Sequence, residues 1–335
     1  MDWKTKLVGY FRLMRFQSAA SESLLILIGA LLMGQHDPWP LLILFCIGVL
    51  FHIYGFVLND YADIEVDKKS VDLKKKPLVS GLIPTQHALI IIIVAVVCIY
   101  ILIIAFFYSV LSVLILSLAL FLGGIYDYFG KKISHISDFF VAGALAFTVL
   151  FGASTVSSNI TIIIYIISLL IFIGIVFANA VEGGLKDVDH DYLGGAKTIP
   201  TLLGVKVADG RLLMTKRFLA FAYGLIALCF LLLIFLFMQP AINFFDGDYL
   251  RLCIVGVLLV VILFVSYKFL SLSLFNRLKM KRLYAVINSL AGVVLLITLY
   301  PFIGLDYLII LLLIPITWYV VFNTLLYGKP LQPDV

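Results

Sequence analysis

Two clusters of acidic residues interrupt a sequence that is otherwise mostly apolar. The first is the run NDYADIEVD at residues 59–67, in which Asn59, Asp63 and Asp67 are each four residues apart. On a helix this spacing places the three side chains in one stripe, with Asp60 beside it. Like charges packed on one face destabilise a helix unless a cation or a basic side chain lies among them. The stripe therefore predicts a cation-binding function.

The second cluster is the run EGGLKDVDHD at residues 182–191, where Asp187 and Asp191 are again four residues apart and Asp189 lies between them. The separation of Asp63 from Asp187 equals that of Asp67 from Asp191, and a loop with matching Pro and Gly positions follows each cluster. This agreement predicts an internal repeat of a helix end, an acidic turn and a Pro/Gly loop. Chance agreement at four positions is the alternative.

The chemistry that suits such clusters is the binding of Mg²⁺, which prefers carboxylate and phosphate oxygens. Carboxylates and phosphates repel each other, so a phosphorylated substrate would need metal ions between them and basic side chains beside them. The sequence therefore predicts a diphosphate site bridged by Mg²⁺. Solvated loops with ordinary topogenic lysines are the alternative. The lysines in question are Lys74, Lys75, Lys76, Lys131, Lys132, Lys186 and Lys197.

The sequence around these clusters predicts membrane helices. Of the 335 residues, 63% are hydrophobic and only 13% are charged, and the mean hydropathy of +1.16 excludes a water-soluble fold. A membrane-spanning helix needs roughly 20 mostly apolar residues. We expect one membrane domain over residues 1–335, in which 12–217 carry both acidic clusters and 218–335 form C-terminal helices. Ten stretches qualify as spans, and they are 16–34, 41–58, 87–107, 111–125, 138–156, 160–180, 218–238, 250–270, 284–302 and 306–326.

Basic residues are concentrated on alternate loops of this topology. Every Lys and Arg except Arg251 falls on the tails or on the loops that follow even-numbered spans. By the positive-inside rule these loops, both acidic clusters and both termini are cytoplasmic. The net charge of +5 follows from this rule and from anionic headgroups, so nucleic acid is not an expected partner. We expect a multi-pass protein in the cell membrane of a prokaryote, with membrane lipids around it.

Several of these motifs together resemble one protein family. The run NDYADIEVD resembles the NDxxDxxxD motif of the UbiA superfamily of intramembrane prenyltransferases. The run KDVDHDYLGGAKTIPTLLG at 186–204 is similar to that family's second acidic motif, and KPLVSG at 76–81 is similar to its R-P-L-x-S-G element, with Lys76 in place of Arg. Tyr126 with Lys131 resembles a Tyr…Lys pair of the family, and Arg15 stands where the family has an Arg. The resemblance covers about residues 12–215.

The resemblance implies an all-α integral membrane bundle of nine to ten transmembrane helices around a central cavity, capped by cytoplasmic Asp-rich loops. It also implies Mg²⁺-dependent transfer of a prenyl group from a prenyl diphosphate to a small acceptor. The implied metal ligands are Asn59, Asp63, Asp67, Asp187 and Asp191. The implied catalytic residues are Asp63, Asp67, Asp187, Asp191 and Lys131. The implied substrate-binding residues are Arg15, Asn59, Asp60, Lys76, Tyr126, Lys132, Lys186 and Lys197.

The acceptor stays open between a glyceryl phosphate lipid, a sugar phosphate and an aromatic acid for quinone synthesis. The lysine run at 74–76 weakly favours a phosphorylated or acidic acceptor. Glu22, about one turn inside the first span, is expected to pair with a basic residue or to contact the acceptor. His52 and His87 are expected to be packing or interface residues.

Two other classes of membrane protein are alternatives to a prenyltransferase. A CDP-alcohol phosphotransferase would carry a D-G-x-x-A-R element before its aspartates, and the sequence after Asn59 has no such arginine. A transporter without enzymatic activity would keep charged residues near the membrane midplane, whereas here they are concentrated at one end of the spans. Both classes are therefore less favoured than a prenyltransferase.

Overall fold

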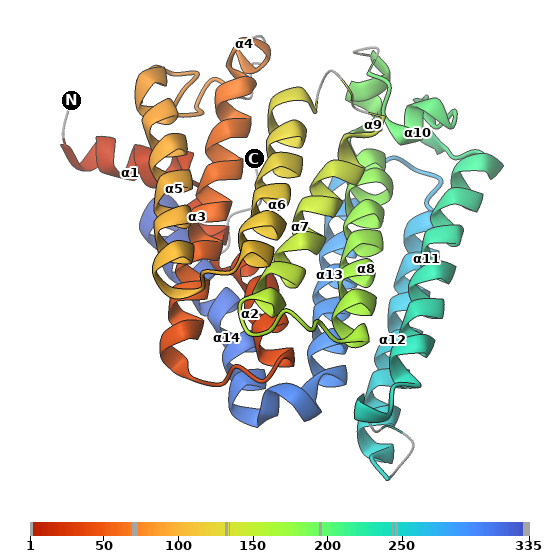
Figure 1. Ribbon diagram of the computed structural model, residues 1–335. Helices are drawn as coiled ribbons and strands as arrows, with labels where there is room; N and C mark the ends of the chain where they lie inside the picture. Colours follow the sequence, from red (N-terminus) through yellow and green to blue (C-terminus); the bar gives the residue numbers. More distant parts are fainter. Residues whose placement is uncertain are drawn as a thin grey trace. The chain divides into compact units, whose positions relative to one another are not determined.

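The computed structural model describes residues 3–68, 73–130, 133, 135–193, 196–242, 244 and 247–330. In this part of the chain nine helices are long and apolar enough to cross a membrane (Figure 1). Each covers one of the predicted stretches, which confirms an all-α membrane protein. These helices are α3 (Pro38–Ala62), α5 (Thr85–Phe106), α6 (Val110–Phe129), α7 (Ser137–Ser154), the continuous run Ile162–Tyr192, α11 (Lys216–Phe237), α12 (Tyr249–Leu270), α13 (Arg277–Thr298) and α14 (Tyr300–Tyr327).

The first predicted span is a broken helix. It consists of α1 (Trp3–Leu13), a short 3₁₀ turn η1 (Phe16–Ser18) and α2 (Ala19–Leu32), with a bend of 48° between α1 and the rest. Counted as one span, this pair raises the number to 10. The bend falls at Arg15, which adopts the left-handed conformation with φ 43° and ψ 44°. That conformation is uncommon for a residue with a side chain.

The continuous run Ile162–Tyr192 contains three helical segments. They are α8 (Ile162–Val176), a π-helical turn η2 (Phe177–Gly183) and α9 (Gly184–Leu193). The π-helical turn lies directly before the second acidic cluster, and such turns are frequent at functional sites.

A small β-hairpin follows the second acidic cluster, and the sequence patterns did not predict it. Strand β1 (Lys206–Ala208) pairs antiparallel with β2 (Arg211–Leu213) across a two-residue loop. Both loop residues, Asp209 and Gly210, have positive φ, as a type I′ turn requires. The remaining short elements are α4 (Ile64–Asp67), α10 (Ile199–Leu202) and η3 (Pro240–Ile242).

The chain divides into two compact units, which are interleaved along the sequence. Unit 1 comprises Met1–Phe129, Ala144–Thr161 and Ile309–Val335, and unit 2 comprises Gly130–Gly143 and Ile162–Leu308. In unit 1, α3 packs against α2, α5 and α6. In unit 2, α8 packs against α11 and α12 against α13 (Figure 1). A single membrane domain with a central cavity stays a prediction.

Two glycines of unit 1 allow α2 and α7 to pack backbone against backbone. A Cβ atom on Gly29 would lie 2.1 Å from the carbonyl oxygen of Val149, and one on Gly152 would lie 2.0 Å from that of Ile26. Such close approach through small residues is a common mode of helix packing in membranes, where the hydrophobic effect does not drive helices together. This close packing against α7 fixes the position of α2, which carries Glu22 in its first turn.

Arg251, the one basic residue that breaks the predicted charge pattern, is buried within unit 2. Its Nε lies 2.8 Å from Asp248 Oδ2, and its guanidinium donates to the carbonyl oxygens of Ile242 and Thr298. It also lies over the Phe244 ring, 4.3 Å from the centroid. These contacts compensate the charge of Arg251 within the protein. Arg251 can therefore lie on the side of the membrane opposite to the other basic residues.

Replacing Gly29 by Ala should lower the stability of the detergent-solubilised protein by about 1–3 kcal/mol, because the added methyl group overpacks the contact between α2 and α7. Thermal unfolding measures this. Gly224→Ala in α11 is the matched control, because open space surrounds Gly224 and alanine is the better helix former. Equal melting temperatures for the two variants would contradict the proposed contact.

Candidate active site

The first acidic cluster lies where α3 ends. Asp63 caps α3, and α4 begins at the next residue. The backbone N–H of Asp63 donates to the Asn59 carbonyl oxygen at 3.0 Å, and that of Asp67 donates to the Asp63 carbonyl oxygen at 2.8 Å. These helical hydrogen bonds across the cap keep the four-residue spacing of the predicted stripe. Asp60, Asp63 and Asp67 are only 5%, 9% and 2% exposed, so their carboxylates require compensating partners.

Lys76 provides that compensation for two of these carboxylates. Its Nζ donates to Asp60 Oδ1 and to Asp67 Oδ2, both at 2.8 Å. Burial by itself would lower the pKa of the Lys76 ammonium, but the two carboxylates outweigh burial and raise that pKa. Lys76 therefore stays charged between Asp60 and Asp67. The predicted role of Lys76 in substrate binding stays a prediction.

Arg15 reaches the same cluster from the break of the first helix. Its Nη2 lies 3.3 Å from Asp60 Oδ1, and its guanidinium lies over the Phe56 ring, 4.7 Å from the centroid. Asp60 thus accepts from two cations on a single carboxylate oxygen. The structure thereby brings together residues of α3, the helix break and the loop after α4.

The second acidic cluster lies on α9 and has its own arginine. Arg277, at the start of α13, donates to Asp189 Oδ1 at 2.7 Å and to the Lys186 carbonyl oxygen at 3.1 Å. The Nζ of Lys186 lies 3.2 Å from Asp187 Oδ2, and the Asp187 side chain is 47% exposed. A basic residue from another helix therefore neutralises this cluster too, within unit 2.

The remaining predicted site residues vary in how the structure places them. Asp191 accepts a hydrogen bond from the Thr198 side chain, and Lys197 is exposed. Tyr126 is half-buried near the end of α6. Lys131 and Lys132 lie outside the described residues, so their predicted roles stay predictions.

Two carboxylates near the acidic clusters were not predicted from the sequence. Asp127, near the end of α6, interacts electrostatically with Asp63 and Arg15 within unit 1. Asp138, in the first turn of α7, interacts in the same way with Asp191 within unit 2. Each belongs to no motif, but each stands at the end of an apolar span. Both lie inside membrane-spanning helices, where ionisable residues are rare and usually functional, and that signal could have found both.

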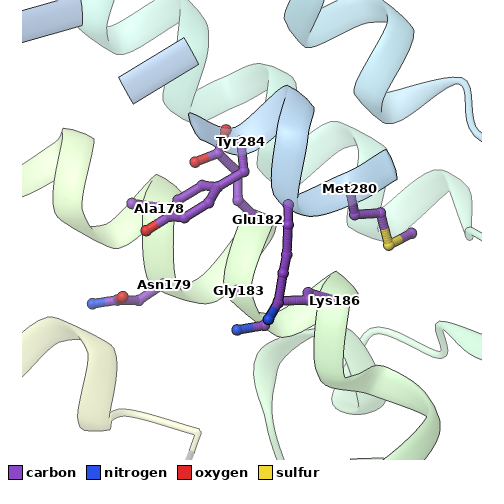
Figure 2. Close-up of a pocket in the computed structure, with 8 residues that line it drawn as sticks. Ala178, Asn179, Glu182, Gly183, Lys186, Met280 and Tyr284 are labelled. Carbon is purple, nitrogen blue, oxygen red and sulfur yellow. The ribbon is translucent and has the colours of Figure 1, made fainter. Parts of the chain in front are cut away.

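A pocket of about 90 Å³ adjoins the second cluster, between the π-helical turn and α13 (Figure 2). Glu182 lines it and is only 1% exposed. Asn288 donates to Glu182 Oε2 at 2.8 Å. The lining residues are Ala178, Asn179, Glu182, Gly183, Lys186, Met280, Lys281 and Tyr284.

The loops that follow the two clusters share one backbone conformation, as the predicted repeat requires. Gly81 and Gly204 both have positive φ, 72° and 83°. The N–H of Gly81 donates to the carbonyl oxygen three residues earlier, and that of Gly204 does the same, at 3.3 and 3.1 Å. The residue before each glycine donates four residues back, at 2.9 and 3.0 Å. Matching hydrogen bonds at matching positions support a repeat over chance agreement.

Mg²⁺ fits the chemistry of the first cluster. Its donors are carboxylate and amide oxygens, the ligands this ion prefers, and a cation already lies between Asp60 and Asp67. Within the described residues no three His, Cys, Asp or Glu side chains form a ready-made metal cage. Mg²⁺ commonly binds through one or two carboxylates, with waters and substrate phosphate completing its shell. The donors therefore suit a metal that binds together with a phosphorylated substrate.

Comparison with known proteins places these features in one family. The model of the UbiA prenyltransferase family matches residues 23–274. The chain is 28% identical over 208 residues to 4-hydroxybenzoate octaprenyltransferase of Yersinia enterocolitica, covering 61% of this chain and 71% of the relative.

Two solved structures share the fold. One, from work on digeranylgeranylglyceryl phosphate synthase in membranes, has a TM-score of 0.68 at 21% identity and covers 90% of this chain and 99% of its own. A UbiA homologue from Archaeoglobus fulgidus, bound to GPP and Mg²⁺, has a TM-score of 0.53 at 16% identity, covering 96% and 99%.

The fold and the site thus define a class of protein: an all-α, multi-pass membrane protein with carboxylate clusters at the ends of its helices. The chain belongs to the UbiA prenyltransferase family, and it is an enzyme of the prenyltransferase type. The match excludes the transporter and CDP-alcohol phosphotransferase alternatives.

Replacing Lys76 by Met should destabilise the protein by about 2–3 kcal/mol, because Asp67 loses its ammonium partner while it stays buried. Added Mg²⁺ should then raise the melting temperature of this variant more than that of the wild type, because the ion replaces the lost cation. Lys68→Met is the control, since the Lys68–Glu65 pair is largely exposed. Identical Mg²⁺ responses of Lys76→Met and wild type would argue against a cation site here.

Proposed function

We propose that this protein transfers a prenyl group from a prenyl diphosphate to a small acceptor, with Mg²⁺ as its cofactor, at the cytoplasmic face of the cell membrane. The observation that carries the proposal is the mixture of buried carboxylates and basic side chains at the end of α3. Asp60 and Asp67 surround the Lys76 ammonium, and Arg15 adds a second positive charge. Such a site suits an anionic ligand that arrives with its own metal ions.

The roles of the side chains follow from their charges. Asn59, Asp63 and Asp67 of the first cluster, with Asp187 and Asp191 of the second, would hold Mg²⁺, which supplies positive charge to the donor diphosphate. Arg15, Lys76, Lys131, Lys132, Lys186 and Lys197 would neutralise the phosphate oxygens that the metal leaves uncompensated, and Tyr126 would contact the donor.

The proposed reaction breaks the bond between the prenyl carbon and the diphosphate oxygen. The diphosphate leaves with the electron pair, and charge therefore grows on its oxygens as the bond breaks. Basic side chains fixed beside those oxygens stabilise the developing charge most effectively. The acceptor then forms a bond to the prenyl carbon and releases a proton.

The acceptor class is proposed from the charges around the site and from the relatives. The Yersinia relative is named for 4-hydroxybenzoate, an aromatic acid, whereas one solved structure with the same fold comes from work on a glyceryl phosphate enzyme. Both acceptors are anionic, in accord with the basic loops. The lysine run at 74–76 favours the phosphorylated acceptor.

Asp63→Asn and Asp187→Asn should each lower the turnover of Mg²⁺-dependent prenyl transfer by at least about 100-fold, because both variants keep the side-chain volume and lose a negative charge needed by the metal. Transfer of a radiolabelled prenyl group by purified protein measures the loss. Unchanged melting temperatures would show that both variants fold. Full activity in both would refute the proposed metal site.

The acceptor can be identified with geranylgeranyl diphosphate as donor and a panel of acceptors. Geranylgeranylglyceryl phosphate should be prenylated with a higher kcat/KM than 4-hydroxybenzoate, because its phosphate is drawn to the basic loops. The reverse order would assign the protein to quinone synthesis. Omitting Mg²⁺ is the control and should abolish transfer to either acceptor.

A further inference from the structure

At the break in the first helix, backbone carbonyl groups accept hydrogen bonds both from within the turn and from side chains of other helices. Within the turn, the Arg15 carbonyl oxygen accepts from the backbone N–H and the Oγ of Ser18, each at 3.0 Å, and the Phe16 carbonyl oxygen accepts from the Ala19 N–H. The Phe16 carbonyl oxygen accepts from Trp318 Nε1 at 2.7 Å, and the Arg15 carbonyl oxygen accepts from His52 Nε2 at 3.1 Å. Trp318 belongs to α14 and His52 to α3, both within unit 1. The break is thus held by its own turn and, in addition, by side chains of neighbouring helices, as is usual for an interrupted helix in a membrane.

His52 is buried to a degree unusual for a histidine, with an exposed fraction of 1%. A carbonyl oxygen only accepts hydrogen bonds, so the Nε2 that faces Arg15 carries a hydrogen. The other ring nitrogen, Nδ1, lies 3.3 Å from Glu22 Oε2. Glu22 therefore lies beside the imidazole at ion-pair distance, without a formed hydrogen bond to Nδ1, in a position from which carboxylates orient histidines in many sites. His52 is a buried packing residue, as expected, and it also hydrogen-bonds to a backbone carbonyl; the expected role of Glu22 as a partner of a basic residue or a contact of the acceptor stays a prediction.

Arg15, whose carbonyl His52 contacts, is also the residue whose side chain reaches the first acidic cluster. Arg15 has a left-handed backbone, which costs on the order of 1 kcal/mol or more for a residue with a side chain. Its carbonyl is tied to His52, while its guanidinium lies against Asp60 and over Phe56. His52 and Phe56 lie on the same face of α3, their ring centroids 4.3 Å apart. One face of α3 thus contacts both the backbone and the side chain of Arg15.

We propose that His52 and Glu22 are positioning residues, which hold the backbone of Arg15 so that its guanidinium points at the donor diphosphate. The inference rests on the proposed function, because it assigns Arg15 to the diphosphate. His52 and Glu22 touch no reacting atom in this scheme. They act through the Arg15 carbonyl. When either is lost, the Arg15 guanidinium is no longer held in the orientation that binds the diphosphate.

A matched pair of substitutions at His52 tests the proposal. The amide nitrogen of Gln reaches the place of Nε2, whereas that of Asn reaches only the place of Nδ1. His52→Gln should therefore keep a KM for geranylgeranyl diphosphate within about twofold of the wild type, and His52→Asn should raise it on the order of tenfold, the effect of losing one hydrogen bond. The KM for the acceptor should not change in either variant.

Combining the His52 substitution with Arg15→Met shows whether His52 acts by positioning Arg15 or only supports the fold. In an Arg15→Met background, His52→Asn should change the donor KM by less than about twofold, because no guanidinium remains to be aimed. Glu22→Gln should resemble the wild type, since the Gln side-chain oxygen can accept from Nδ1 in place of the carboxylate and its nitrogen can donate to an unprotonated Nδ1. Glu22→Leu should resemble His52→Asn. Melting temperatures of all variants are measured alongside.

Each outcome decides the question. A tenfold effect of His52→Asn that persists in the Arg15→Met background would overturn the proposal, as would equal donor KM values for the Gln and Asn variants. A His52→Asn variant too unstable to assay, beside a normal His52→Gln, would assign His52 to folding and overturn it as well. A wild-type protein that transfers no prenyl group would instead refute the proposed function.

Discussion

The structure depends on the placement of carboxylates at the ends of apolar helices, where basic side chains from other segments offset the charge of both acidic clusters. Asp60, whose side chain is 5% exposed, and Asp189, whose side chain is 26% exposed, show the same arrangement in the two units. Each lies beside a stripe of acids, and each accepts from an arginine that comes from a different helix. Uncompensated burial of a carboxylate costs far more than a typical protein's net stability allows. The arginines therefore contribute to folding as well as to the charge of the site.

Two irregularities of the backbone lie next to the residues that these arginines contact. Arg15 lies at a break that a regular helix would not contain, and its left-handed conformation turns the chain between α1 and α2. The π-helical turn before α9 precedes the residues that meet Arg277. In both units a deviation from regular helix lies next to the acidic cluster. Departures from regular geometry are expected where side chains must be presented precisely for binding.

Much of the architecture could be predicted from the sequence, because membrane spans follow from long apolar runs. All ten predicted stretches coincide with helices, and the acidic stripes lie at helix ends as their spacing indicated. Lys76 was predicted for the site because it follows the first cluster in a recognisable motif, and the structure places it between Asp60 and Asp67.

The contacts made by residues far apart in the sequence could not be predicted. Arg277 resembles an ordinary topogenic residue, and only the packing of α13 beside α9 brings it to Asp189. His52 is a single polar residue in an apolar run, so no sequence pattern indicates its hydrogen bond to the Arg15 carbonyl. Asp127 and Asp138 follow no motif spacing. Tertiary packing decides all of these, and hydropathy does not encode it.

The hydrogen bond between Trp318 and Phe16 has a consequence for how the protein is made. The two residues are 302 positions apart, and α14 also receives the Arg12 side chain through the Leu326 carbonyl oxygen. Ribosomes release the N-terminal segments first, so the interrupted first helix enters the bilayer long before its last supporting side chains exist. The interrupted first helix can therefore reach its final hydrogen bonding, and unit 1 its final packing, only after α14 has been synthesised and inserted.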